Sequence, residues 1–152
     1  MTPLVSNLWP QFMVDPAFAA CFGQVIVEHA QMLRQERQVI FTLRSGAPLD
    51  KNLCARLLAS LQPDYEGFEL RIQNLFGYAM LDETALRDLM EEMKRDGVPI
   101  NGFLDRCKIN IIGQKITIGV CHGTKFLQEM HFEKLLAERI AAHTGVTPQV
   151  TL

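Results

Sequence analysis

The most reactive side chains in this chain belong to four cysteines and four histidines. A structural zinc site normally uses cysteines spaced roughly two to four residues apart, and no two cysteines here lie that close. The spacing therefore favours free thiols that pack as small apolar side chains. The four cysteines are Cys21, Cys54, Cys107 and Cys121, and the four histidines are His29, His122, His131 and His143.

Two pairs among these eight residues are close enough in sequence to be considered as reactive or metal-binding pairs. Cys121 and His122 are adjacent, but neighbouring side chains on a strand point to opposite faces, so we do not expect a thiol–imidazole pair. His122 and His131 lack a third ligand at a suitable spacing. The chain also contains no P-loop, G-x-G-x-x-G, H-E-x-x-H or G-x-S-x-G motif. We therefore predict no catalytic residue, no metal site and no cofactor in this chain.

Basic side chains in the last third of the chain form a second group with possible binding chemistry. Residues 98–152 carry six Lys and Arg against four Asp and Glu. KH domains clamp single strands with a G-x-x-G loop between two helices, and neither Gly119 nor Gly123 lies in such a loop. Aliphatic residues on the expected strands offer no stacking surface. We therefore interpret these basic side chains as solvated cations, with weak DNA binding as the alternative. The candidate contacts to nucleic acid or to a partner are Arg106, Lys108, Lys115, Lys125 and Lys134.

Acidic side chains gather in one expected helix, between residues 82 and 96. Residues 1–97 carry nine basic and thirteen acidic side chains, so they are more acidic than the remainder. Such a charge run is either a solvated helix face or a docking face for a basic partner. The candidate acidic docking face consists of Glu83, Asp88, Glu91 and Glu92.

The composition of the whole chain fits an ordinary globular protein. It has 152 residues, 48% hydrophobic residues and a net charge of −2. These values exclude disorder and argue against strong non-specific binding to nucleic acid. No apolar run approaches the roughly 18 residues of a membrane span, and the N-terminus does not resemble a signal peptide. We expect a cytoplasmic chain without membrane contact, folded as one domain or two small ones.

Alternating apolar residues predict the strands of a first unit. Residues 1–22 are interrupted by three prolines and predict loops with one short helix. The pattern then predicts an antiparallel pair of strands, around residues 24–30 and 39–43, with a polar turn over residues 31–37. Asp50 is the expected N-cap of a helix that Pro63 ends, and residues 68–72 form a third strand.

A second unit follows the helix that Asp82 is expected to cap. Residues 107–120 predict a hairpin around Gly113-Gln114. One long helix should then run from Thr124 to Gly145, before a strand at residues 146–152. The expected core face of that helix consists of Phe126, Leu127, Met130, Leu135, Leu136 and Ile140. The predicted fold is α+β, with two small β-β-α-β units joined by a helix and divided into residues 1–97 and 98–152.

Two stretches of this sequence resemble one protein family. They are FLDRCKINIIGQKITIGVCHGTKFLQEMHFEKLLAERIAAHTGVTPQVTL, from Phe103, and VIVEHAQMLRQERQVIFTLRSGAPL, from Val25. Their spacing resembles the N-terminal region of the PolC-type replicative polymerase, the α subunit of DNA polymerase III in low-GC Gram-positive bacteria. The chain departs from the family at residues 39–41, where the family often has a Trp, and at residues 76–78, where a Tyr-Trp pair often follows the third strand.

The resemblance implies a function for the chain as part of a larger enzyme. The parent would be a DNA-directed DNA polymerase, a nucleotidyltransferase, but no catalytic residue of the family transfers to this chain. Residues 98–152 would be a KH-like unit that serves in protein–protein docking during DNA replication. The implied partners are replisome proteins such as the clamp loader, the helicase or an initiator. The alternatives are a single-stranded nucleic-acid-binding KH-like module and a free-standing adaptor protein.

Overall fold

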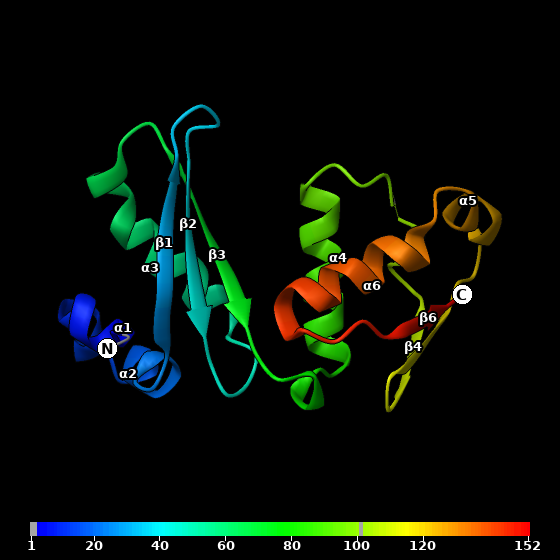
Figure 1. Ribbon diagram of the computed structural model, residues 1–152, viewed down its shortest axis with the longest axis horizontal. Helices are drawn as coiled ribbons and strands as arrows, with labels where there is room; N and C mark the ends of the chain where they lie inside the picture. The colour runs from blue at the N-terminus through cyan, green and yellow to red at the C-terminus, as the bar shows by residue number, and fades with distance from the viewer. Residues whose placement is uncertain (1–2, 101) are drawn as a thin grey trace. The chain divides into compact units, whose positions relative to one another are not determined.

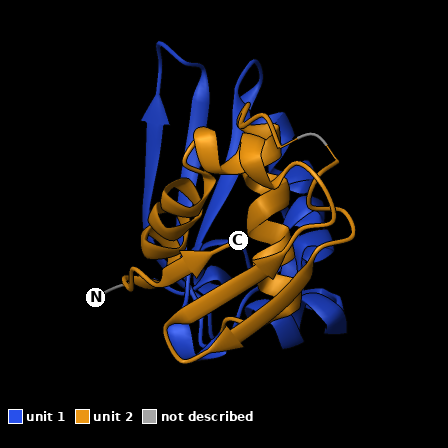
Figure 2. Cartoon of the chain, turned by 90° about the vertical axis from the view of Figure 1, so that its right-hand side faces the viewer, with its two compact units in different colours: residues 1–80 blue, residues 81–152 orange. Residues whose placement is uncertain are grey.

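The computed structural model describes residues 3–100 and 102–152 and confirms the α+β class (Figure 1). The chain divides into two compact units, Met1–Met80 and Leu81–Leu152, which Figure 2 shows in different colours. We expected the division at residue 97, after the helix that was predicted to join the units. That helix instead belongs to the second unit, because its apolar stripe, including Leu86 and Met93, is buried there.

The first unit contains a three-stranded sheet in the order β1-β2-β3. As predicted, β1 and β2 are antiparallel, whereas β2 and β3 are parallel. The helix between β2 and β3 makes this parallel pairing possible, since a parallel connection has to cross over the sheet. The elements are α1 (Val5–Leu8), α2 (Pro16–Phe22), β1 (Ile26–Leu33), β2 (Gln38–Arg44), α3 (Lys51–Leu61) and β3 (Glu69–Leu75).

Local signals in the sequence explain where these elements begin and end. The carboxylate of Asp50 accepts hydrogen bonds from the backbone of Asn52 and Leu53, which confirms it as the N-cap of α3. The turn after β1 is shorter than predicted. Residues 31–33 continue the strand, because they stay paired with β2, and only residues 34–37 form the turn.

The N-terminal segment is more regular than the sequence indicated. It contains α1, α2 and a 3₁₀ turn at Pro10–Val14, where loops and one short helix were expected. Its aromatic side chains enter the core of the first unit, where Trp9 meets Phe41 edge to face with ring centroids 5.5 Å apart. Val5 and Phe22 are fully buried in the same core. The helices therefore cover one face of the sheet.

The second unit begins with a helix and contains another three-stranded sheet, in the order β4-β5-β6. The hairpin of β4 and β5 is confirmed, and its two-residue turn has Gly113 at φ 56°. Strands β5 and β6 are parallel, again across a helical connection. The elements are α4 (Glu83–Arg95), β4 (Lys108–Ile112), β5 (Lys115–Gly119), α5 (Thr124–Glu129), α6 (Phe132–Thr144) and β6 (Gln149–Thr151).

The prediction of one long helix after Thr124 is wrong, because the helix is interrupted between α5 and α6. His131 adopts the left-handed conformation at this break, with φ 59°. The reason lies in two fully buried leucines, Leu127 and Leu136. Nine residues of continuous helix would place them on opposite faces. The break turns both into the core and leaves Phe126 and Leu135, which we expected there, exposed.

The core of the second unit lies between the helices and one face of its sheet. Buried side chains on β5 and β6 point to this face. Among the described residues, no helix is both long enough and apolar enough to cross a lipid bilayer. The fully buried large side chains of this unit are Leu86, Met93, Ile116, Ile118, Leu127, Phe132, Leu136 and Ile140.

Candidate functional site

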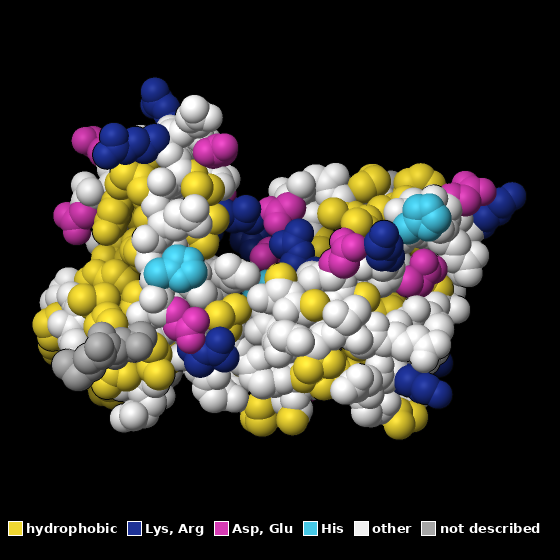
Figure 3. Space-filling model, in the orientation of Figure 1, with side chains coloured by type: hydrophobic (Ala, Val, Ile, Leu, Met, Phe, Trp, Pro, Cys, Tyr) yellow, Lys and Arg dark blue, Asp and Glu magenta, His cyan; other side chains and the backbone are white. Residues whose placement is uncertain are grey.

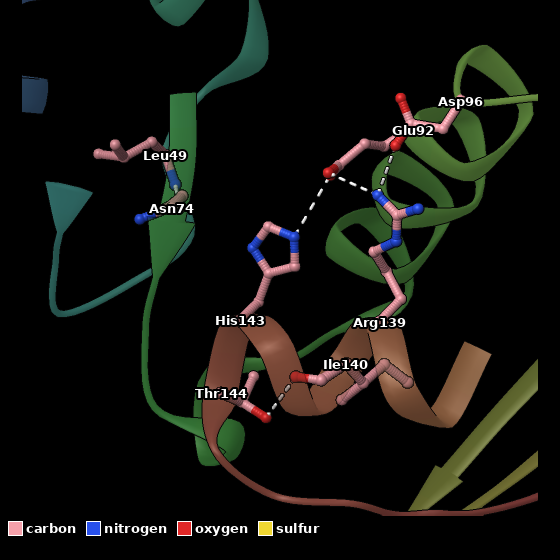
Figure 4. A network of polar contacts seen from close by, with 8 residues as sticks. All are labelled: Leu49, Asn74, Glu92, Asp96, Arg139, Ile140, His143 and Thr144. Carbon is pink, nitrogen blue, oxygen red and sulfur yellow. Dashed lines mark hydrogen bonds and ion pairs between the residues drawn. The ribbon is translucent and has the colours of Figure 1, made fainter. Parts of the chain in front are cut away.

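Four polar side chains of α4 and α6 form a network, which we call the α4–α6 cluster: Glu92, Asp96, Arg139 and His143 (Figure 4). Nη1 of Arg139 donates to Oε1 of Glu92 at 2.9 Å and to Oδ2 of Asp96 at 2.8 Å. Nε2 of His143 lies 3.4 Å from the other carboxylate oxygen of Glu92. Glu92 and Asp96, the C-cap of α4, are four positions apart, as are Arg139 and His143, so one face at the end of α4 meets one face of α6.

The charges of this cluster stabilise one another. Burial alone would raise the pKa of Glu92, but His143 and Arg139 outweigh it and the net pKa lies below the usual value. Burial also disfavours the charge on Arg139, but the carboxylates of Asp96 and Glu92 outweigh this effect. The pKa of Arg139 therefore lies above its usual value. The three ionised groups are therefore already satisfied by one another. This arrangement suits a clasp between two helices better than a reaction centre.

The structure does not assemble the predicted acidic docking face. Glu92 belongs to the α4–α6 cluster, and Glu83 pairs with Arg87 at 2.9 Å. Asp88 also has an interaction within the chain. Glu91 is exposed to solvent. Half of the predicted face is thus engaged in ion pairs of the second unit, which leaves less charge for a basic partner.

The five predicted basic contacts are all exposed, and none forms an ion pair within the described part of the chain. They are divided between two sides of the second unit. Lys108 and Lys115 lie on the uncovered face of the sheet, whereas Lys125 and Lys134 lie on α5 and α6, which cover the other face. Arg106 precedes β4. The structure therefore does not bring all five together.

The charge asymmetry in the sequence also disappears at the observed boundary. Residues 1–80 carry six basic and seven acidic side chains, and residues 81–152 carry nine and ten. The basic excess of residues 98–152 is balanced by α4, which belongs to the same unit. Figure 3 shows basic and acidic side chains interspersed on the visible face.

The uncovered face of the second sheet, which we call the open sheet face, follows from the strand alternation. Residues of β4 and β5 alternate between more and less exposed positions, and the paired strands place their exposed residues on one side. Ile112 is the apolar exception on this face, with 67% of its side-chain surface exposed. The open sheet face consists of Lys108, Asn110, Ile112, Lys115, Thr117, Gly119, Gln149 and Thr151.

The adjacent residues Cys121 and His122 contact different neighbours. The thiol of Cys121 lies 4.0 Å from the backbone oxygen of Arg106, and the ring of His122 stands edge-on to Phe103 at 5.4 Å. Burial, followed by the nearby Cys21 and Asp50, raises the pKa of Cys54 to about 12. Among the described residues, no group of three or more His, Cys, Asp or Glu side chains could hold a metal ion.

The connection between α5 and α6 is a helix–turn–helix without glycine. Met130 and His131 form the turn, and His131 occupies its left-handed position. A G-x-x-G loop lets a phosphate backbone approach the main chain closely, because glycine has no side chain. Here the imidazole and the thioether of the turn residues replace that open surface. The turn is therefore poorly suited to clamp nucleic acid.

No sequence motif marks Arg139 or His143 as functional, although both belong to the α4–α6 cluster. Their signal in the sequence is the spacing of four, which matches the spacing of Glu92 and Asp96. That spacing gains meaning only when the two helices are known to cross.

Comparisons with protein-family models, with curated proteins and with solved structures find no match to this chain.

Proposed function

We propose that this chain is a non-catalytic docking region that binds another protein. The observation that carries the proposal is the open sheet face, which presents Ile112 among polar and basic side chains. Ile112 lies at the hairpin end of this face, opposite Lys115, and an apolar side chain with polar neighbours is the arrangement found in protein contacts. The polar cluster of the same unit is occupied in joining α4 to α6, which leaves surfaces rather than a reactive cleft as its means of recognition.

The family resemblance gives this docking region a setting. In the proposed setting, the chain is the N-terminal region of a PolC-type polymerase in the cytoplasm, and its second unit is KH-like. The helix–turn–helix of α5 and α6 beside a three-stranded sheet supports that part of the proposal. The catalytic residues of the polymerase would then lie outside this sequence. The partners would be the clamp loader, the helicase or an initiator.

Biolayer interferometry on immobilised residues 1–152 tests the proposal. Purified clamp-loader, helicase and initiator proteins are the analytes. We expect one of them to bind and its affinity to fall at least about tenfold in Ile112→Asp, because a charge would replace the apolar side chain of the contact. Val14→Asp is the matched control, since Val14 is 85% exposed but lies in the first unit. Absence of binding, or metal-dependent primer extension by this chain, would contradict the proposal.

Single-stranded nucleic acid is the second candidate ligand, because Lys108 and Lys115 share the open sheet face and have no ion-pair partner among the described residues. Two phosphate contacts should give a salt dependence of about −1.4 in log K against log salt. Fluorescence anisotropy with a single-stranded oligonucleotide should then show weaker binding by the Lys108→Ala/Lys115→Ala variant than by Lys125→Ala/Lys134→Ala. Equal binding by both variants would remove this candidate.

The reading frame beyond codon 152 separates the polymerase setting from a free-standing adaptor. Exonuclease and polymerase sequence after this codon is expected for the PolC setting. A stop codon would contradict that setting and favour the adaptor, while leaving the docking role itself to the interferometry experiment.

A further inference from the structure

Three aromatic rings, which we call the aromatic corner, meet on the surface of the second unit. The ring of Phe103 stands edge-on to that of His122, with centroids 5.4 Å apart and 82° between the ring planes. It also contacts the ring of Phe126, at 5.5 Å and 58°. Phe103 is half-buried, whereas His122 and Phe126 are exposed. Among the described residues, Phe126 is the only Phe, Tyr or Trp that the fold leaves exposed.

The aromatic corner lies where the hairpin of β4 and β5 continues beyond its paired strands. There the thiol of Cys121 lies 4.0 Å from the backbone oxygen of Arg106. The ring of Phe103 rests on the backbone of Gly123, so the two segments stay side by side. The corner is therefore at the opposite end of the hairpin from Ile112, the anchor of the proposed docking through the open sheet face.

The core of the second unit does not include these rings. Apart from Met93 and Phe132, its fully buried large side chains are leucines and isoleucines. Aromatic side chains at a surface are enriched in protein interfaces, because each brings a large and rigid apolar area into contact. Three rings that meet outside the core therefore indicate a contact site.

The angles between the rings favour one kind of ligand. Successive bases of a single strand stack on open ring faces. Here neighbouring ring planes are strongly inclined, and Gly123 covers part of the Phe103 ring. Inclined rings enclose a single inserted side chain, and another aromatic ring packs against them edge to face. The corner thus suits the anchor residue of a protein better than a nucleic acid.

The surroundings of the aromatic corner are basic. The two segments that supply its rings, residues 102–108 and 119–126, contain three cations and one carboxylate. All three cations are exposed, and none has an ion-pair partner among the described residues. The carboxylate of Asp105 turns back over Gly102, in its own turn. This local excess of positive charge, in a chain of net charge −2, favours an acidic ligand over a cation. The cations are Arg106, Lys108 and Lys125.

We propose that the aromatic corner binds an acidic segment of a partner protein through an aromatic or large aliphatic anchor residue. The anchor packs against the exposed rings of His122 and Phe126, and carboxylates beside it pair with Arg106 and Lys125. Both parts are needed, because exposed ion pairs alone contribute little affinity. This surface is separate from the open sheet face, so the inference goes beyond the proposed function and does not depend on replisome proteins.

Selection from a random phage-displayed peptide library on the immobilised chain tests the class of ligand. We expect the enriched peptides to carry Asp or Glu beside an aromatic or large aliphatic residue. A fluorescein-labelled synthetic copy of one such peptide should bind with a dissociation constant of roughly 1 to 100 µM, since so small an interface is typical of weak complexes. Added salt should weaken this binding, because it screens exposed charges.

Substitutions locate the peptide on the surface. Phe126→Ala should weaken its binding at least about tenfold, whereas Ile112→Ala, which truncates an exposed apolar residue at the other end of the hairpin, should not. Lys125→Glu should weaken binding at least about fivefold, because it repels the carboxylates of the peptide. Lys134→Glu is the matched control, since it reverses the charge of an exposed lysine on α6. Thermal melts check that all four variants fold.

Alkylation of Cys121 provides a readout that needs no substitution. This exposed thiol lies between the two segments of the corner. Saturating peptide should slow its reaction with iodoacetamide at least about threefold, because the bound segment covers it. The half-buried thiol of Cys21, in the first unit, is the internal control and should react at an unchanged rate.

Each result decides the proposal. Weaker binding by Phe126→Ala and Lys125→Glu, together with protection of Cys121, supports it. A selection that enriches no peptide, or peptides without acidic residues, overturns it, as does equal binding by Lys125→Glu and Lys134→Glu. Peptides that require Ile112 instead of Phe126 overturn it and favour the open sheet face. Tighter binding of a single-stranded oligonucleotide, weakened by Phe126→Ala, also overturns it and assigns the corner to nucleic acid.

Discussion

The ring of Phe103 packs directly against the backbone of Gly123. A Cβ atom at Gly123 would lie 2.5 Å from Cδ1 of that ring and 2.7 Å from Cγ. Gly123 also has φ 82°, a conformation that residues with side chains rarely adopt. His122 and Phe126 contact the same ring, so Phe103 is held from three sides. Two independent constraints thus require glycine at this position.

Replacing this glycine should be costly. We expect Gly123→Ala to lower the free energy of unfolding by about 3 kcal/mol, from left-handed strain and overpacking together. Gly145→Ala is the matched control, because Gly145 has φ 75° but open space around it. It should lose only the strain, about 1 kcal/mol. Urea denaturation measures both, and equal losses would contradict the packing of Phe103.

The ion pair between Glu92 and Arg139 in the α4–α6 cluster should contribute to the stability of the second unit. Both side chains are about one-quarter exposed, so removing one leaves a partly desolvated charge. Arg139→Leu should lower the free energy of unfolding by about 2 kcal/mol. Arg44→Gln breaks a more exposed ion pair with Glu28 and should cost less than about 1 kcal/mol. A smaller loss in Arg139→Leu than in Arg44→Gln would show that the clasp is not stabilising.

The lowered pKa of Glu92 predicts a dependence of stability on pH. When the pH is above 4.5, the ordinary pKa of a glutamate, Glu92 is ionised in both the folded and the unfolded chain. Its full contribution to the free energy of unfolding is then present. As pH falls below that value the unfolded chain takes up the proton first, so stability is lost. Asp15 has a lowered pKa as well, because of the backbone amide of Ala17 and then Arg56. The loss between pH 5 and pH 3 should therefore be smaller in Glu92→Gln than in the parent. Parallel profiles in thermal melts would contradict this role.

The four thiols should differ in their rate of alkylation. Cys121 is exposed and should react first with iodoacetamide at neutral pH. Cys54, whose pKa burial raises to about 12, and the buried Cys107 should react only after unfolding. Intact mass spectrometry followed by peptide mapping distinguishes the sites. Alkylation of Cys54 at the rate of Cys121 would contradict the packing of α3.

Neighbouring leucines on α6 provide a test of which face is buried. Leu136→Asp should destabilise the chain by several kcal/mol, because it buries an unpaired charge in a fully enclosed position. Leu135→Asp makes the same change one residue earlier, where 36% of the side chain is exposed. We expect it to cost less than about 1 kcal/mol. Differential scanning calorimetry should separate the two, and similar melting temperatures would mean that the face is assigned incorrectly.

Much of the fold could be predicted from local sequence signals. Capping by Asp50 and Asp82 is confirmed, as is the hairpin turn at Gly113. These features depend on a few adjacent residues and need no tertiary information. The long helix after Thr124 failed for the opposite reason. Its apolar residues do satisfy a helical spacing, and only the need to bury Leu127 and Leu136 together breaks it.

The candidate binding residues were harder to predict than the fold. The acidic run of α4 could be found, but not that α6 would turn Arg139 and His143 towards Glu92. The charge asymmetry depended on a boundary at residue 97, and the buried stripe of α4 moved that boundary to residue 80. Which cations and anions neutralise one another is decided by helix crossings, and these have no signature within a single helix.

The parallel strand pairs have a consequence for the order in which the chain folds. Each closes a loop of similar length, with 31 residues separating Gln38 from Glu69 and 34 separating Thr117 from Thr151. Hairpins form within microseconds, whereas these longer loops must first lose more chain entropy. In each sheet the third strand should therefore dock last. Among the described residues, no strand of one sheet pairs with a strand of the other. The first sheet can therefore form during synthesis, once Leu75 has left the ribosome and before the second sheet is made.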